Sequence, residues 1–152
     1  MIYSYESFTM SNVVSKRYFS DKAHIIDAEK DFLNSLVSIQ KIRLRGPLVY
    51  VIEYVAESEI LSIRFMISIY NDYNPELKDF RYDSYFGIET ALCCKIYPDE
   101  MKSQADQLYD LMCEEAKKEN MKLISSIYFT KSMLDNTGFF SLYAAVEPEI
   151  QS

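Results

Sequence analysis

The strongest constraint on the fold is an alternating stretch at residues 61–70, LSIRFMISIY. A period of two is typical of a half-buried β-strand, because successive side chains of a strand point to opposite faces. The face that would meet a core carries Leu61, Ile63, Phe65, Ile67 and Ile69. The opposite face is mixed and carries Ser62, Arg64, Met66, Ser68 and Tyr70.

The residues before this strand predict a strand, a helix and a further strand. Residues 7–19 are rich in β-branched and aromatic types, which favour a strand. Residues 23–40 carry apolar side chains at three- and four-residue spacing, which predicts an amphipathic helix capped by Ser20. Residues 48–55 predict a strand entered through a Gly46-Pro47 turn, because this pair cannot continue a helix.

The second half of the chain repeats this order. After a polar linker at 71–84, residues 85–97 predict a strand, and a helix follows from Pro98 to about Glu119 with a stop at Asn120. Residues 123–130 and 139–147 predict two more strands, joined by a loop with the turn sequence DNTG. We therefore expect residues 1–152 to form one domain of two pseudo-repeats, 1–70 and 85–150.

Two β-α-β-β halves predict an α+β fold. They would pair edge to edge into one antiparallel-rich sheet, with both helices covering one face. The other face would be open, concave and partly polar.

Composition argues against several classes of protein. The net charge of −7 speaks against nucleic-acid binding, which needs clustered Lys and Arg. We expect no membrane segment, because no apolar run approaches the roughly 20 residues of a membrane span. The three cysteines form no C-x-x-C pair, and the N-terminal residues show neither the basic segment nor the apolar run of a signal peptide. We therefore expect a reduced, cytoplasmic protein.

Catalytic and metal sites are not predicted. His24 is the only histidine, so a metal site with two histidines cannot form within one chain. Cys93 and Cys94 would point to opposite faces of one strand, and the three glycines form no phosphate-binding loop. The sequence therefore predicts no enzyme, no catalytic residue and no cofactor.

Several polar residues are candidates for binding, each with a structural alternative. Glu53 interrupts an apolar face of its strand, and a carboxylate buried there would have a raised pKa. Alternatively, Glu53 is exposed to solvent, because this face of the strand points away from the core or because the strand lies at the edge of the sheet. Arg64 could hold a ligand carboxylate or pair with Glu89. Glu89 and Glu147 could favour a cationic group or be solvated strand residues. Tyrosine suits pockets and interfaces, and the candidates to line a cleft are Tyr50, Tyr54, Tyr97, Tyr128 and Tyr143.

Short passages of the chain resemble a known superfamily. They are NVVSKRY (12–18), DFL (31–33), GPLVYVIEYV (46–55), YDSYFGIE (82–89) and EEAKKENMKLISSIYF (114–129). With the duplicated order, they look like the GyrI-like, or effector-binding, superfamily, and more closely like a bacterial family of unknown function often found near LXG-type toxins of type VII secretion.

The resemblance implies a small-molecule site. GyrI-like relatives bind small, often cationic or amphipathic molecules in the cleft between the halves, commonly with a Glu on the strand after the second helix. The corresponding residues here, 126–130 (SIYFT), contain no acid, which departs from that pattern.

We therefore predict a non-enzymatic, stand-alone binding module that holds a small amphipathic or cationic ligand in that cleft. The alternative is an accessory or adaptor that binds a partner protein, such as a type VII secreted toxin. Homodimerisation is compatible with both predictions.

Overall fold

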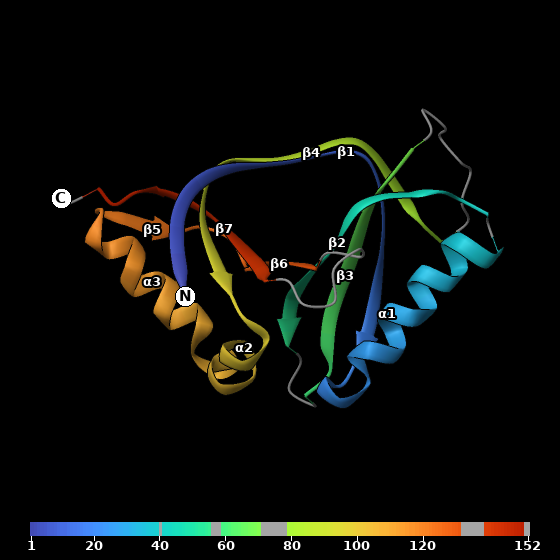
Figure 1. The fold of residues 1–152 in the computed structure, drawn as a ribbon, viewed down its shortest axis with the longest axis horizontal. Helices are drawn as coiled ribbons and strands as arrows, with labels where there is room; N and C mark the ends of the chain where they lie inside the picture. The colour runs from blue at the N-terminus through green and yellow to red at the C-terminus, as the bar shows by residue number, and fades with distance from the viewer. Residues whose placement is uncertain (40, 56–58, 71–78, 132–138, 151–152) are drawn as a thin grey trace. The chain divides into compact units, whose positions relative to one another are not determined.

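The computed structural model describes residues 1–39, 41–55, 59–70, 79–131 and 139–150 (Figure 1). The chain divides into two compact units. Unit 1 consists of Met1–Thr9 and Gly87–Ser152, and unit 2 of Met10–Phe86. Both boundaries fall inside long strands, β1 (Ile2–Ser20) and β4 (Arg81–Ile96). These bounds differ from the predicted repeats at 1–70 and 85–150, because periodicity locates a strand but not the core to which each of its residues belongs.

Unit 2 has the predicted order of strand, helix, strand and strand. It contains the second half of β1, helix α1 (Ile25–Asn34), β2 (Leu44–Val55) and β3 (Leu61–Ile69). β3 lies between β1 and β2 and is antiparallel to both. The predicted apolar face of β3 packs against the helical segment. This core includes Val14, Phe32, Leu36, Leu48, Ile63, Phe65, Ile67 and Ile69.

The first helical segment begins and ends differently from the prediction. Asp21, not Ser20, caps it: the Asp21 Oδ1 accepts a hydrogen bond from the His24 backbone N–H at 3.0 Å. A 3-10 turn at Lys22–His24 precedes α1, and a π-helical turn at Ser35–Ile39 follows it. The spacing of apolar residues indicated the helix but does not distinguish these turn types.

Gly46-Pro47 is not the turn predicted before a strand, because both residues lie inside β2. The register against β3 shifts between Arg45 and Val49, which marks a β-bulge. Gly46 has a φ of 81°, a left-handed conformation that glycine adopts without steric cost. Pro47 is tolerated next to it, because residues at a bulge need not donate to the ladder.

The mixed face of β3 is more buried than the sequence predicts. Ser62, Met66 and Ser68 are 0 %, 5 % and 8 % exposed, whereas Arg64 is partly exposed. Alternation identifies which residues share a face, but it carries no information on whether a second face is covered.

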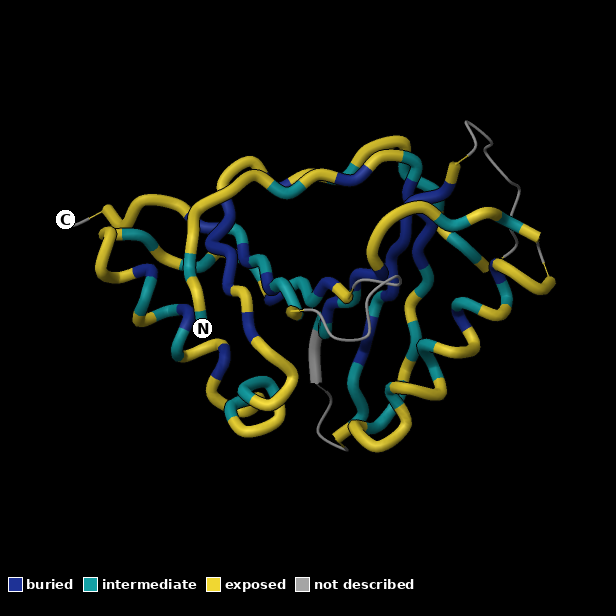
Figure 2. The backbone as a smooth tube through the Cα atoms, viewed as in Figure 1, coloured by how far each residue is buried: buried dark blue, intermediate teal, exposed yellow. Residues whose placement is uncertain are grey.

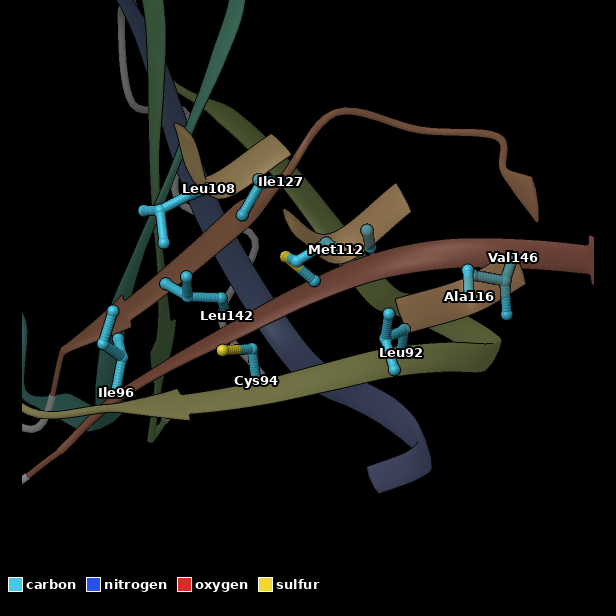
Figure 3. Close-up of a cluster of buried hydrophobic side chains, with 10 residues drawn as sticks. Leu92, Cys94, Ile96, Leu108, Met112, Ala116, Ile127, Leu142 and Val146 are labelled. Carbon is cyan, nitrogen blue, oxygen red and sulfur yellow. The ribbon is translucent and has the colours of Figure 1, made fainter. Parts of the chain in front are cut away.

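Unit 1 packs α3 (Leu108–Lys118) against a second antiparallel set of strands. β7 (Phe140–Pro148) pairs with β4, with β5 (Met121–Leu123) and with β6 (Tyr128–Lys131). Side chains of β4 and β7 meet those of the helix in one core (Figure 3). This core includes Leu92, Cys94, Ile96, Leu108, Met112, Ala116, Ile127, Leu142, Ala144 and Val146.

Two predicted elements of unit 1 are interrupted. The helix expected from Pro98 to Glu119 is two α-helices, α2 (Pro98–Gln104) and α3, separated by a 3-10 turn. The strand expected at 123–130 is divided into β5 and β6. At this break the Ser125 Oγ accepts a hydrogen bond from the Ala145 N–H at 2.8 Å, so a side chain replaces the ladder acceptor. The predicted stop at Asn120 is confirmed by its φ of 56°.

The strands β1 and β4 extend further than the sequence predicts. β1 begins at Ile2 instead of residue 7, and β4 at Arg81, so the expected linker at 71–84 ends inside a strand. Residues 2–9 of β1 and 81–90 of β4 are mostly exposed (Figure 2). The residues that extend these strands beyond the prediction, 2–6 of β1 and 81–84 of β4, include none that is buried, so no alternation of buried and exposed side chains marks them as strand. Residues 71–78, and 132–138 of the predicted loop, lie outside the described part of the chain.

Among the described residues, no helix has both the length and the apolar character needed to span a membrane.

Candidate functional site

Unit 2 carries a charged group on the sheet face opposite α1, which we call the arginine cluster: Ser15, Arg17, Glu53 and Arg64. The Arg17 Nε and Nη2 donate to the two carboxylate oxygens of Glu53 at 2.9 and 3.0 Å. The Arg64 Nε lies 3.3 Å from Oε1 of the same carboxylate, and the Arg64 Nη1 donates to the Ser15 Oγ at 3.3 Å. One carboxylate thus serves two guanidinium groups.

This geometry decides between the two interpretations of Glu53. Its side chain is 28 % exposed. The hydrogen bond from Arg17 lowers the pKa of Glu53, and the charge of Arg64 acts in the same direction against the effect of burial. Glu53 is therefore an ionised, paired carboxylate and not a buried acid with a raised pKa. Arg64, for which Glu89 was a predicted partner, pairs with Glu53 instead.

Unit 1 carries a second group on the sheet face opposite α3, which we call the aromatic–acid cluster: Ser4, Glu6, Phe8, Cys93 and Tyr143. The rings of Phe8 and Tyr143 stack with centroids 4.5 Å apart and an interplanar angle of 22°. Cys93 and Tyr143 are direct partners across β4 and β7, and β1 lies on the other side of β4. Cys93 is on the strand between those of the two rings, and its small side chain leaves room for them to meet.

The acid of this cluster is ionised. A hydrogen bond from the Ser4 hydroxyl, at 2.8 Å, lowers the pKa of Glu6, and hydrogen bonding with Cys93 adds to the effect. Burial and the neighbouring Glu6 carboxylate raise the pKa of the Cys93 thiol to about 11. Burial, followed by the charge that Cys93 would carry, raises the pKa of Tyr143 well above its usual value. At neutral pH the cluster therefore presents one carboxylate, a neutral thiol and two rings.

Four of the five predicted tyrosines have side chains in the described structure, and two of these four lie together. Tyr128 of β6 is the direct cross-strand partner of Tyr143, and both are half-buried. Tyr50 points instead to the α1 core, where its ring centroid lies 6.0 Å from that of Phe65, and burial raises its pKa to about 12. Tyr97 is the residue before α2 and is 51 % exposed. The side chain of Tyr54 lies outside the described structure.

The two remaining acids are on the surface. Glu89 is an exposed residue of β4. Glu147 is exposed near the end of β7, where its Oε1 lies 3.3 Å from the Lys122 Nζ. The structure thus groups Glu53 with Arg64 and Tyr128 with Tyr143, while Glu147 pairs only with a neighbouring lysine among the described residues. The role of these nine residues in binding, and the cleft between the two halves, stay predictions.

Sequence reasoning did not single out several residues that build these clusters, namely Ser4, Glu6, Phe8, Ser15 and Arg17. The expected strand at 7–19 began too late to include Ser4 and Glu6, although both share a face with Phe8 at a spacing of two. Arg17 lies within that expected strand but was not among the predicted binding residues. The sequence did contain a signal for Arg17, because its spacing places it on the same face of the strand as Val13 and Ser15.

A hollow of about 540 Å³ lies elsewhere in unit 1. It is lined by Tyr109, Leu123, Ile124, Ser125 and Ser126, where β5 ends and the chain turns towards β6. No predicted binding residue lines this hollow.

Within the part of the chain that the structure describes, no group of three or more His, Cys, Asp or Glu side chains is arranged to hold a metal ion. His24 is exposed, and its Nδ1 lies 2.6 Å from the Asp21 Oδ1; this hydrogen bond raises the pKa of His24. All three cysteines are free. Cys94 packs in the α3 core while Cys93 lies on the opposite face, as the alternation predicts.

The three thiols are expected to differ in reactivity. Burial raises the pKa of Cys93 and Cys94 to about 11, so that about 0.1 % of each is thiolate near pH 8, whereas Cys113 is partly exposed. Iodoacetamide followed by peptide mass spectrometry should therefore modify Cys113 at least about tenfold faster than the other two. Cys113→Ser should remove the fast reaction, and equal rates at Cys93 and Cys113 would contradict the described burial.

Comparison with known proteins places the chain in a family. The model of a domain of unknown function, DUF5085, matches residues 9–147. The chain belongs to the DUF5085 family. The arginine cluster of this DUF5085 chain lies within the matched residues, as do Cys93 and Tyr143, whereas Ser4, Glu6 and Phe8 precede them. No curated protein sequence matches the chain.

Solved structures with the same fold are distant in sequence. The chain matches EcmrR in a complex with DNA at 13 % identity and a TM-score of 0.65, over 96 % of this chain and 58 % of the longer EcmrR chain. It matches the EcmrR C-terminal domain at 12 % identity and a TM-score of 0.64, over 97 % of this chain and 99 % of that one. SAV2435 bound to tetraphenylphosphonium matches at 11 % identity and a TM-score of 0.59, over 97 % and 94 %.

These matches and the strand order of each unit confirm the predicted α+β, GyrI-like fold for this DUF5085 chain.

Proposed function

We propose that this protein is a non-enzymatic module that binds a small amphipathic cation at the aromatic–acid cluster of unit 1. The observation that carries the proposal is the ionised Glu6 carboxylate beside the stacked rings of Phe8 and Tyr143. Aromatic faces attract cations, and a nearby carboxylate adds a favourable charge. The half-buried Tyr128, directly across from Tyr143, extends the aromatic surface.

The position of the acid is compatible with the fold. The strand after the second helix, where GyrI-like relatives carry a Glu, has none in this chain, and Glu6 brings a carboxylate to the same unit from β1 instead. A protein of the same fold, SAV2435, has been solved with tetraphenylphosphonium, a monocation that carries four aromatic rings. This supports the choice of an aromatic cation as the ligand class.

A non-enzymatic role is part of the proposal. Burial raises the pKa of the Cys93 thiol to about 11, which keeps this thiol protonated and poorly nucleophilic at neutral pH. The His24 side chain is held on the surface by Asp21, which caps the 3-10 turn before α1.

The proposal is tested by calorimetric titration of the full chain with tetraphenylphosphonium. Glu6→Gln removes the charge but keeps the shape, and should weaken binding about fivefold, the effect of one solvent-exposed charge at about 4 Å. Tyr143→Ala should weaken binding more than about tenfold, whereas Tyr143→Phe keeps the ring and should stay within about twofold.

The matched control is Glu114→Gln, which makes the same change in net charge in the same unit, at an exposed position of α3 on the opposite side of the sheet. It should leave tetraphenylphosphonium binding within about twofold of the unchanged protein. If folded Glu6→Gln and Tyr143→Ala proteins bind tetraphenylphosphonium as the unchanged protein does, the cluster is not the cation site.

The alternative role, an adaptor for a partner protein such as a type VII secreted toxin, stays a prediction from the sequence, as does homodimerisation. Native mass spectrometry of the protein isolated from its own host distinguishes the two roles. A retained small-molecule mass supports the module, and a clean apo mass with a stoichiometric protein companion supports the adaptor.

A further inference from the structure

Strand β5 is an open edge of the unit 1 sheet. Among the described strands it pairs with β7 alone. The Ile124 N–H donates to the Ala145 C=O at 2.8 Å, so Ile124 directs its N–H towards β7. Because the backbone groups of successive residues alternate between the two sides of a strand, Met121 and Leu123 direct their N–H and C=O groups away from β7. These two residues therefore offer donors and acceptors to a further strand.

A groove runs between this edge and α3, which lies beside β5 (Figure 1). Its helical wall carries Tyr109, Cys113 and Lys117, which share one side of α3 because they are four residues apart. Its strand wall is formed by residues 121–126. The hollow of about 540 Å³ lies at the Tyr109 end, and a smaller hollow of about 110 Å³ lies at the Lys117 end. Leu123 lines both hollows, so they adjoin, and we call them together the α3–β5 groove.

The smaller hollow has the size of a side chain and not of a whole ligand. Pockets for drug-sized molecules measure about 300–1,000 Å³, well above its volume of about 110 Å³. Cys113, Met121 and Leu123 line it, which favours an apolar side chain. The larger hollow combines the half-exposed Tyr109 ring with the Ser126 hydroxyl, which favours a ring with a polar tip.

The charges at the smaller hollow balance. Lys117, Lys122 and Glu149 line it, and the Lys122 Nζ lies 3.3 Å from Oε1 of Glu147. Two ammonium groups and two carboxylates leave no formal charge for a guest to neutralise. An uncharged guest therefore matches the hollow, because a charged one would lose hydration without gaining a counter-charge.

We propose that the α3–β5 groove binds an uncharged, extended segment of a partner protein, which pairs with β5 as an additional antiparallel strand. The backbone of the segment would form the hydrogen bonds, and the two hollows would select its side chains. Segment residues opposite Met121 and Leu123 would point to the α3 side of the sheet, where both of these residues pack. Such residues are two positions, or about 6.8 Å, apart, which matches hollows lined by residues 121–123 and 123–126.

A second copy of this chain is the poorer occupant of the groove. Two β5 strands that exchange hydrogen bonds between Met121 and Leu123 about a two-fold axis would place the two Lys122 side chains opposite one another, and like charges in that position repel. The groove lies on the α3 side of the sheet, whereas the aromatic–acid cluster lies on the opposite face. Peptide binding is thus an activity separate from the cation binding proposed above.

The test is a titration of the isotope-labelled full chain with the peptide acetyl-TYTVT-amide, followed by NMR. The tyrosine of the peptide would lie opposite Leu123 and its valine opposite Met121. The N–H signals of Met121 and Leu123 should shift, and their N–H groups should exchange with solvent at least about tenfold more slowly in the bound state. N-methylation of the peptide valine removes an N–H that points to β5 and should weaken binding about tenfold. N-methylation of the central threonine is the matched control, because this N–H points away from β5, and it should change the affinity by less than about twofold.

Variants of Cys113 test the smaller hollow. Cys113→Phe fills it and should weaken peptide binding at least about tenfold, whereas Cys113→Ser keeps the side-chain size and should stay within about twofold. In the unchanged protein the peptide should slow the iodoacetamide modification of Cys113 at least about fivefold, because the peptide valine would cover the thiol. If circular dichroism shows that Cys113→Phe does not fold, the two N-methylated peptides and the protection of the thiol still decide.

Four results would overturn the proposal. The first is equal binding of the two N-methylated peptides, or no shift at Met121 and Leu123 with the unmodified peptide. The second is unchanged peptide binding by a folded Cys113→Phe protein. The third is competition by tetraphenylphosphonium, which would place the peptide at the aromatic–acid cluster. The fourth is a dimer in sedimentation whose Met121 and Leu123 N–H groups are protected without peptide, which would assign the edge to a second copy of the chain.

Discussion

Phe65→Ala is expected to lower the free energy of unfolding by about 3–5 kcal/mol, the range for removing a fully buried aromatic ring. Phe65 is 0 % exposed in the centre of β3. Its ring centroid lies 5.6, 5.7 and 6.0 Å from those of Tyr18, Phe32 and Tyr50, so one substitution removes three ring contacts. The cavity would adjoin β1, α1 and β2 together, and no single flexible side chain could fill it.

Urea unfolding followed by circular dichroism measures this loss. The matched control is Phe19→Ala in the same unit, because Phe19 is 64 % exposed and should change the free energy of unfolding by about 0.5 kcal/mol or less. Equal losses for the two variants would mean that Phe65 does not lie at the centre of the unit 2 core.

Leu142→Ala should destabilise unit 1 by about 2–5 kcal/mol, through the lost apolar contact and the remaining cavity. Leu142 is 0 % exposed in β7 and is the direct partner of Cys94 in β4 and of Phe129 in β6. In the core it lies with Met112 of α3, so the cavity would open between the helix and the strands it covers (Figure 3).

Hydrogen exchange with mass spectrometry locates the effect of Leu142→Ala. Exchange should accelerate in β4, β6 and β7. The matched control, Leu142→Met, nearly conserves the side-chain volume and should lower the free energy of unfolding by less than about 1.5 kcal/mol. A free energy of unfolding for Leu142→Ala within about 1 kcal/mol of the unchanged protein would contradict the described packing.

The sequence was a reliable guide where side-chain alternation and backbone chemistry act over a few residues. The strand at 61–70 was predicted nearly to the residue, and its apolar face is the face that meets Phe32 and Leu36. The end of α3 before Asn120 was predicted as well, because asparagine tolerates the left-handed conformation that ends a helix. Where the polar side chains lie in space was predictable only in part.

The candidate sites show why. Glu53 and Arg64 were both singled out in the sequence, but their shared partner Arg17 lies 36 residues from Glu53 and is brought to it by the register of three strands. Phe8 and Tyr143 meet over a still longer separation. Tyr50 was predicted to line a cleft, yet it faces the α1 core, because both faces of β2 carry apolar residues and their alternation does not specify which face meets the helix.

Alternation, helical spacing and turn residues are properties of neighbouring residues, and they were enough to specify the β-α-β-β order of each half and its two apolar faces. The pairing of charges and rings depends on strand register, on bulges and on the division of β1 and β4 between two cores. A shift of one residue moves every side chain of a strand to the opposite face, so these pairings follow from the packed sheet and not from the local pattern.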